Sequence, residues 1–336
     1  MMERPIRRAV FRWAVLAAFA PFLVAAQQRS ATPGVTLHRI GYLGLRGMTQ
    51  TAPSLAALKD GLRELGHVEG DDYLLDVRLA NDDPDRYPAL ITELTALKVE
   101  LIVAASTPAA IAIHKANPAM PIVIGRGPDL IGAGLAGSAE HPGGIATGIE
   151  ELAPGMIDKR LRFLKQAVST LSHVAILSAA PTEGAHSLQY KEAEQSAKAI
   201  GVTIRAYRVS AATDFSKVFD DITKDGADGL LALNGVLPGP VQRSIVQLAA
   251  HHHLPAMYPA VDFVQLGGFM AYGQRSPEMF RFAATYVDKI FKGAKPGDLP
   301  LTNWTKLYLS VNTQTAAALG ITLSPSLLSQ ADEVVK

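Results

Sequence analysis

The chain has 336 residues, a formal net charge of +1 and no cysteine. The small net charge argues against a broad electrostatic footprint for nucleic acid. Without cysteine there is no disulfide framework, thiolate nucleophile, thiolate metal site or lipid-attachment cysteine. Apolar residues make up 48% and charged residues 19%, as in an ordinary globular protein. The length is sufficient for two domains of about 100–200 residues each.

The first 26 residues predict a secretory signal peptide. Basic residues stand at Arg4, Arg7, Arg8 and Arg12. The uncharged apolar run 13–26 that follows is shorter than the roughly 20 residues of a membrane-spanning helix. It ends in small residues before Gln27, which fits signal-peptide cleavage there. We therefore expect a periplasmic protein, with an uncleaved anchor and export through the twin-arginine route as alternatives.

Beyond residue 38, short apolar runs alternate with longer amphipathic ones. Strands are predicted at 40–45, 73–79, 101–105, 121–124 and 145–149, and helices at 54–65, 84–97 and 108–116. This order is typical of a parallel sheet with helical crossovers. A glycine-rich stretch, 125–144, precedes the last of these strands and is expected to form a loop.

The second half repeats the pattern of the first. It predicts strands at 173–178, 203–209, 229–233, 256–258, 268–272 and 306–311, and helices at 188–200, 212–224, 242–250, 262–266, 277–292 and 313–319, before a tail at 325–335. The predicted fold class is therefore α/β, with two doubly wound parallel-sheet lobes in tandem.

Two motifs that suggest cofactors have simpler interpretations. His251, His252 and His253 are consecutive, and consecutive helical side chains point about 100° apart, so they cannot converge on one ion without unwinding. Residues 132–137 match GxGxxG, but Pro142 and the glycines after it leave no room for the helix that a dinucleotide site requires. No nucleophile elbow, P-loop or zinc-protease motif occurs, so no catalytic residue, metal or cofactor is expected.

Candidate ligand-binding residues lie at or near the carboxyl ends of the predicted strands, because open α/β sheets bind ligands there. They are Tyr42, Ser106, Thr107 and Asp129 in the first half, and Thr182, Asn234, Tyr258, Asp262 and Tyr272 in the second. Thr107 is predicted to cap a helix that has Pro108 at its first position, and the free N–H groups there could hold a carboxylate. An ordinary capped helix, and core positions for the tyrosines, are the alternatives.

Several segments together resemble the substrate-binding components of ABC importers, in a group of the type I periplasmic-binding fold whose better-known members bind tryptophan or tyrosine. The matching segments are 58–70, 106–110, 132–144, 254–258, 267–273, 286–300 and 309–328. The chain departs from the group at 127–129, where Gly-Pro-Asp replaces Ser-Asp-Pro, and at Ile145, where the group has asparagine. The first departure alters an edge of the expected pocket.

The resemblance implies two lobes, residues 35–148 with 275–304 and residues 149–274 with 305–336. Their hinge is expected near Gly148, Gln274 and Pro300.

The function implied is a monomeric receptor, not an enzyme. It would trap a small solute, such as an amino acid or an aromatic or other carboxylate compound, between the lobes and deliver it to an ABC permease. A sensor partner of a membrane signalling protein and an exported α/β enzyme are the alternatives.

Overall fold

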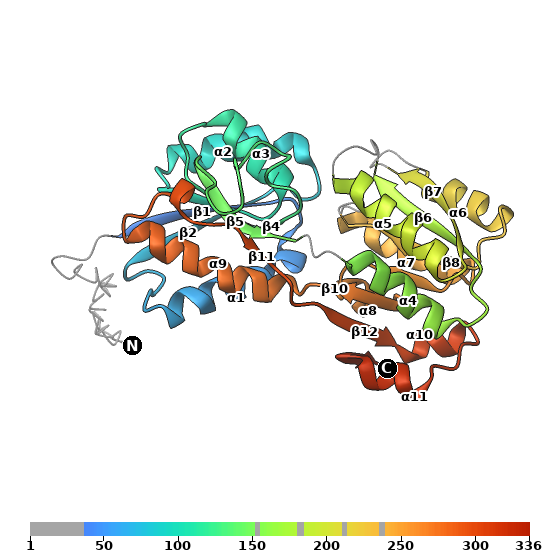
Figure 1. The fold of residues 1–336 in the computed structure, drawn as a ribbon. Coiled ribbons are helices and arrows are strands. Elements are labelled where there is room, and N and C mark those ends of the chain that lie inside the picture. Colours follow the sequence, from blue (N-terminus) through green and yellow to red (C-terminus); the bar gives the residue numbers. More distant parts are fainter. Residues whose placement is uncertain (1–36, 152–154, 180–184, 210–213, 235–238) are drawn as a thin grey trace, which may run out of the picture. The chain divides into compact units, whose positions relative to one another are not determined.

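The computed structural model describes residues 37–151, 155–179, 185–209, 214–234 and 239–336. The expected signal peptide therefore lies outside the described residues. Within them the chain forms two mostly parallel sheets with helices on both faces (Figure 1). The α/β fold class predicted from the sequence is thus confirmed.

The first sheet, sheet A, has the strand order β11-β5-β4-β3-β1-β2, and all its paired strands are parallel. Its strands are β1 His38–Gly44, β2 Tyr73–Leu79, β3 Leu101–Ala104, β4 Ile122–Gly127, β5 Ala146–Glu150 and β11 Thr302–Asn303. The central strand β3 is wholly apolar and buried, as expected for a parallel strand covered on both faces.

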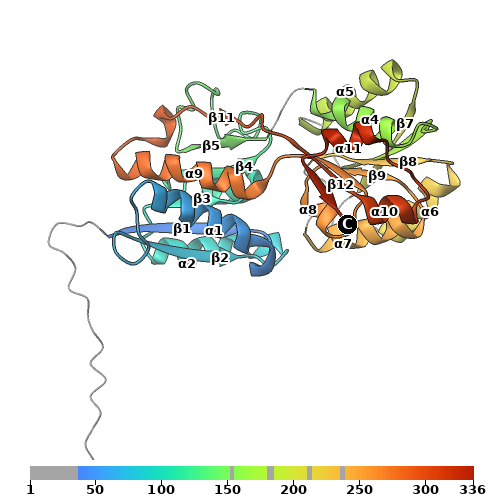
Figure 2. The same cartoon turned by 90° about the horizontal axis from the view of Figure 1, so that it is seen from below.

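Four helices cover sheet A. They are α1 Met48–Glu64 and α9 Ser276–Phe291 on one face, and α2 Tyr87–Ala96 and α3 Thr107–Ala116 on the other; two short 3₁₀ turns span Pro84–Arg86 and Pro296–Asp298. Figure 2 shows α1 and α9 side by side. Glycine permits this close approach, because a Cβ atom at Gly61 would lie 2.3 Å from the carbonyl oxygen of Arg281.

His67 ties the loop after α1 to α9. Its Nδ1 lies 2.7 Å from Asp72 Oδ2 and its Nε2 lies 3.0 Å from Asp288 Oδ1. Partial burial of the ring lowers the pKa of His67, but hydrogen bonds to Asp288 and Asp72 outweigh that effect and raise its pKa above the ordinary value. The cationic form is thus favoured in the folded protein.

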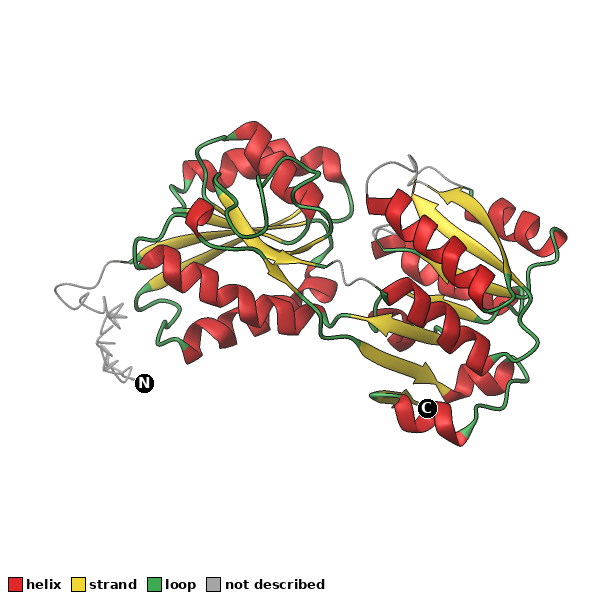
Figure 3. Ribbon diagram, viewed as in Figure 1, coloured by secondary structure: helices red, strands yellow, loops and turns green. Residues whose placement is uncertain are grey.

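The second sheet, sheet B, has the order β13-β12-β10-β9-β8-β6-β7, with β10 and β12 antiparallel. Its strands are β6 His173–Ala179, β7 Thr203–Val209, β8 Gly229–Ala232, β9 Ala256–Tyr258, β10 Met270–Gly273, β12 Tyr308–Asn312 and β13 Glu333–Val335. Its helices are α4 Met156–Ala167, α5 Ala185–Ala199, α6 Phe215–Lys224, α7 Gly239–His251, α8 Asp262–Gln265, α10 Thr313–Ala318 and α11 Pro325–Gln330 (Figure 3).

Helix α4 and strand β13 are absent from the expectations drawn from the sequence. The buried face of α4 includes Arg160, a fully buried charged residue among apolar ones, which interrupts the helical pattern. Strand β13 is short and half exposed, and it exists because it pairs with β12. By contrast, residues 132–137 form turns and open no helix, as expected.

The segments that connect the two sheets differ by a few residues from the expected hinge. Strand β5 continues past Gly148 to Glu150, because Ile149 pairs with Thr302 of β11, so the chain leaves sheet A a few residues after Gly148 and after Pro300. The hinge near these residues stays a prediction. Gln274 follows β10 directly, and its Nε2 donates to the carbonyl oxygen of residue 151 at 2.7 Å. The connections are therefore hydrogen-bonded to one another beside sheet A.

Among the described residues, no helix is both long enough and apolar enough to cross a membrane.

Candidate functional site

Tyr42, at the carboxyl edge of sheet A, is part of the core. Its ring packs against Phe280 of α9, with ring centroids 5.8 Å apart, and burial raises the pKa of its hydroxyl. The strand position was read correctly from the sequence, but the side chain points toward the face that α1 and α9 cover.

Ser106, and not Thr107, caps α3. The N-cap of α3 is Ser106, whose Oγ accepts from the N–H of Ala109 at 3.5 Å, so the expectation that Thr107 caps this helix is wrong. Thr107 is the first helical residue, and its hydroxyl donates to the carbonyl oxygen of Pro128 at 2.9 Å. A Cβ atom at Gly127 would lie 2.2 Å from that hydroxyl oxygen, so the glycine of the unusual Gly-Pro-Asp segment makes room for this bond.

Asp129 shapes a turn on the same edge. It has a positive φ of 52°, and its Oδ1 accepts from the N–H of Gly132 at 2.9 Å. A short polar side chain that bonds its own backbone tolerates this conformation. The carboxylate of Asp129 thus already has a hydrogen-bond partner within its own loop.

Two arginines on this edge lie in the segments 42–46 and 126–129, which the sequence places at strand ends, although neither was selected as an individual candidate. Arg46 follows β1 and is only 23% exposed, yet its guanidinium makes no hydrogen bond among the described residues, and its nearest carboxylate oxygen, Asp262 Oδ2, lies 4.0 Å away. Arg126, in β4, is 3.1 Å from Glu151 Oε1. Burial, and then the neighbouring Arg126, lower the pKa of Arg46, while Glu151 raises the pKa of Arg126. The sequence feature that pointed to these two arginines was their position just after the end of a predicted strand.

Asp82 adds a carboxylate close to Arg46. Its N–H donates to the carbonyl oxygen of Leu45 at 2.7 Å, and its Oδ1 is buried without a hydrogen-bond partner. Burial raises the pKa of Asp82, and the charge of Arg46 partly offsets this. The edge of sheet A therefore presents both a poorly paired cation and an unsatisfied carboxylate oxygen.

At the carboxyl edge of sheet B, Arg160 of α4 joins three strand ends. Its Nε donates to the carbonyl oxygen of Tyr272 at 2.7 Å, its Nη1 to Asn234 Oδ1 at 2.5 Å, and its Nη2 to the carbonyl oxygen of Pro259 at 3.0 Å. The residue is 0% exposed, and burial lowers its pKa to about 9. A charge so deeply buried requires hydrogen bonds of this kind.

The other sheet B candidates have different surroundings. Tyr258 stacks on Phe263 with centroids 4.8 Å apart and is enclosed in the core. Tyr272 is also largely buried, and its hydroxyl accepts from Lys159 Nζ at 3.3 Å. Asp262 is half exposed and faces Arg46. Thr182 lies outside the described residues.

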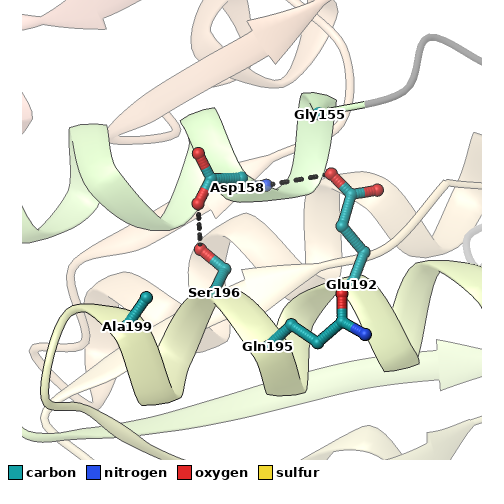
Figure 4. A pocket seen from close by; sticks show the side chains of 6 residues that line it. All are labelled: Gly155, Asp158, Glu192, Gln195, Ser196 and Ala199. Carbon is teal, nitrogen blue, oxygen red and sulfur yellow. Dashed lines mark hydrogen bonds between the residues drawn. The ribbon is translucent and has the colours of Figure 1, made fainter.

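A surface depression of about 550 Å³ between α4 and α5 is separate from these groups (Figure 4). Glu192 Oε1 accepts from the N–H groups of Ile157 and Asp158 at 3.1 and 3.2 Å and thereby caps α4, whose N-cap Gly155 has no side chain. Asp158 accepts from the Ser196 hydroxyl at 2.6 Å. These polar groups hold the two helices together, so we place the ligand site elsewhere.

The family described as ABC transporter substrate binding protein matches residues 52–335. The chain belongs to this family. Its members are extracytoplasmic receptors that bind small solutes and work with a membrane permease, and the resemblance inferred from the sequence is thereby confirmed.

Individual relatives are distant. A tyrosine-binding protein from Clostridioides difficile (strain R20291) is 23% identical over 278 residues, covering 80% of this chain and 77% of the relative. A crystal structure of an ABC domain from Streptococcus pneumonia in complex with L-Trp has a TM-score of 0.80 at 21% identity, covering 89% of this chain and all of that one.

The ligand-free, open structure of a substrate-binding protein with adhesive properties from Clostridium difficile gives a TM-score of 0.68 at 19% identity, again over 89% of this chain and all of that one. At such identities the structural likeness shows the fold alone.

Proposed function

We propose that this receptor binds a small amino acid or related organic carboxylate, and that it does so between a lobe built on sheet A and a lobe built on sheet B. The observation that carries the proposal is Arg46, a largely buried guanidinium at the carboxyl end of β1 that lacks a close carboxylate partner. Guanidinium groups bind carboxylates through charge-assisted and often paired hydrogen bonds. A solute carboxylate would give Arg46 the partner that the protein does not supply.

Asp82 supports an amino acid within this class. Its buried Oδ1 has no partner, and an ammonium group beside Arg46 would provide donors for it. The relatives that bind tyrosine and L-Trp are themselves amino-acid binders, which is consistent with this choice.

The rest of the proposed biology follows from the family. We propose that residues 1–26 are removed on export, that the protein acts in the periplasm as a monomer, and that it delivers its solute to an ABC permease without chemical change. Of the candidates from the sequence, Asn234 and Asp262 stay as proposed site residues, whereas Ser106, Thr107 and Asp129 shape the loop around the site.

Titration calorimetry with L-tryptophan, L-tyrosine, L-phenylalanine and L-phenylalaninamide tests the carboxylate assignment. We expect at least one of the three acids to bind. Replacing Arg46 with methionine should weaken that binding by about tenfold to a hundredfold, because a hydrogen bond to a charged group contributes roughly 1.5–3 kcal/mol.

The matched control is Arg63→Met on the exposed side of α1, where Arg63 forms an ion pair with Asp60 of its own helix. Its affinity should equal that of the wild type. Binding of the amide as tight as that of the acid, or no loss in Arg46→Met, contradicts the proposal.

A further inference from the structure

We propose that Gln189 and Ser178 form a subsite in the sheet B lobe that binds a hydrogen-bond acceptor oxygen of the solute. This inference rests on the proposed function, because it concerns the other end of the same site. Neither residue was among the candidates from the sequence.

Gln189 presents hydrogen-bond donors that have no partner. The backbone N–H of Asn234 donates to Gln189 Oε1 at 2.9 Å, and this bond fixes which end of the amide is oxygen. The opposite end, Nε2, is therefore an NH₂ group with two donors. It is buried without a partner in the described structure, and the whole residue is 3% exposed. Buried donors in native proteins nearly always have an acceptor, supplied by protein, water or ligand.

Ser178 presents a second unsatisfied group on the same edge. It is the next-to-last residue of β6, is 1% exposed, and its hydroxyl also lacks a partner in the described structure. The carbonyl oxygen of Leu177 accepts from the N–H of Leu233, the residue before Asn234. Ser178 and Gln189 thus approach the end of β8 from a neighbouring strand and from α5.

The surroundings decide which chemistry these groups can receive. Arg160 Nη1 donates to Asn234 Oδ1, so the amide nitrogen of Asn234 is a further donor, and Arg160 itself bonds only neutral acceptors among the described residues. The charges of Glu151 and Glu192 also act on Arg160, but the groups without partners next to Asn234 are the donors of Gln189 and the hydroxyl of Ser178. They favour a carbonyl, hydroxyl or carboxylate oxygen and disfavour an ammonium group.

Matched solutes test the subsite. L-tyrosine and L-glutamine each add a polar oxygen group to L-phenylalanine and L-norvaline, so the ratio of affinities within a pair isolates that group. We expect the wild-type protein to prefer the oxygen-bearing member of at least one pair by about tenfold, as measured by titration calorimetry.

Gln189→Glu is the sharpest variant, because it keeps an oxygen for the N–H of Asn234 and replaces the donor with a second oxygen. It should abolish the preference. Ser178→Ala should reduce it about threefold. Gln195→Glu changes charge in the same way on the exposed face of the same helix, and it should leave the ratio unchanged.

Each result is decisive. A ratio that is the same in wild type, Gln189→Glu and Ser178→Ala overturns the subsite, even if Arg46→Met still loses affinity and the proposed function stands. A fall in the stability of the solute-free Ser178→Ala protein with an unchanged ratio shows that the groups hold a structural water, and also overturns it. If none of these amino acids binds, the proposed function fails and this inference fails with it.

Discussion

Replacement of Arg160 with lysine tests how the carboxyl edge of sheet B is held together. The guanidinium donates from three different nitrogens to Tyr272, Asn234 and Pro259, whose accepting oxygens stand at the ends of three strands. The lysine ammonium group is a compact point charge on a shorter side chain, so lysine can keep about one of these three bonds. Each bond from a charged donor contributes about 1.5–3 kcal/mol, and two would be lost. A lower desolvation cost for the smaller, readily neutralised group offsets part of that sum. We expect a net loss of about 3 kcal/mol.

Urea denaturation followed by circular dichroism measures this loss. The matched control is Arg162→Lys on the same helix, because Arg162 is half exposed and pairs with Asp158 at 2.8 Å one turn away. Its effect should stay below about 0.5 kcal/mol, as for other exposed helix pairs. An Arg160→Lys protein within 1 kcal/mol of wild type would refute the idea that the fork geometry of the guanidinium supports this edge.

Three further outcomes are expected. The pKa of His67 is raised in the folded protein, so its contribution to stability is complete below its unfolded pKa of about 6.5 and is lost as the pH rises through the folded value. Above pH 6.5, the free energy of unfolding measured with urea should therefore fall more steeply with pH for wild type than for His67→Gln. Equal slopes would contradict this. Gly148 has φ of 140° and an added Cβ would lie 2.2 Å from the carbonyl oxygen of Ile124, whereas Gly66 has φ of 94° with open space around it. Gly148→Ala should therefore lower the free energy of unfolding by about 3 kcal/mol or more, and Gly66→Ala by about 1 kcal/mol. Equal losses would show that backbone strain acts without the steric clash. N-terminal sequencing of periplasmic protein should begin at or near Gln27, and an intact N-terminus would contradict cleavage.

Most strands of the fold were predictable from the sequence because buried parallel strands are short apolar runs between turn residues. The strand at 203–209 was placed at the right residues, and that at 101–105 to within one residue. Helix α4 was missed although Ile157, Leu161 and Leu164 recur at helical spacing; what periodicity could not indicate is that a charged residue, Arg160, lies in the same buried face. The limits of β5 depend on its pairing with β11, a strand about 150 residues away in sequence.

The candidate site was less predictable, because position on a strand does not determine where a side chain points. Tyr42 lies within β1 and Tyr258 ends β9, as the sequence indicated, but both rings pack into the core. Thr107 bonds a carbonyl 21 residues later, a contact that no local motif indicates. Arg46 lay within a segment recognised as a strand end, yet its isolation from carboxylates is a property of the folded chain.

The two edges differ in the chemistry they present, and that difference limits the solute. The edge of sheet A combines Arg46 with the unsatisfied oxygen of Asp82, so it offers both signs of charge. The edge of sheet B offers donors from Gln189 and a positive charge from Arg160. Under the two proposals above, a solute that satisfies both edges carries an anionic and a cationic group at one end and an oxygen acceptor at the other. Under the same proposals, small apolar solutes would leave these buried polar groups without partners, and the free energy this costs predicts that they bind more weakly than amino acids do.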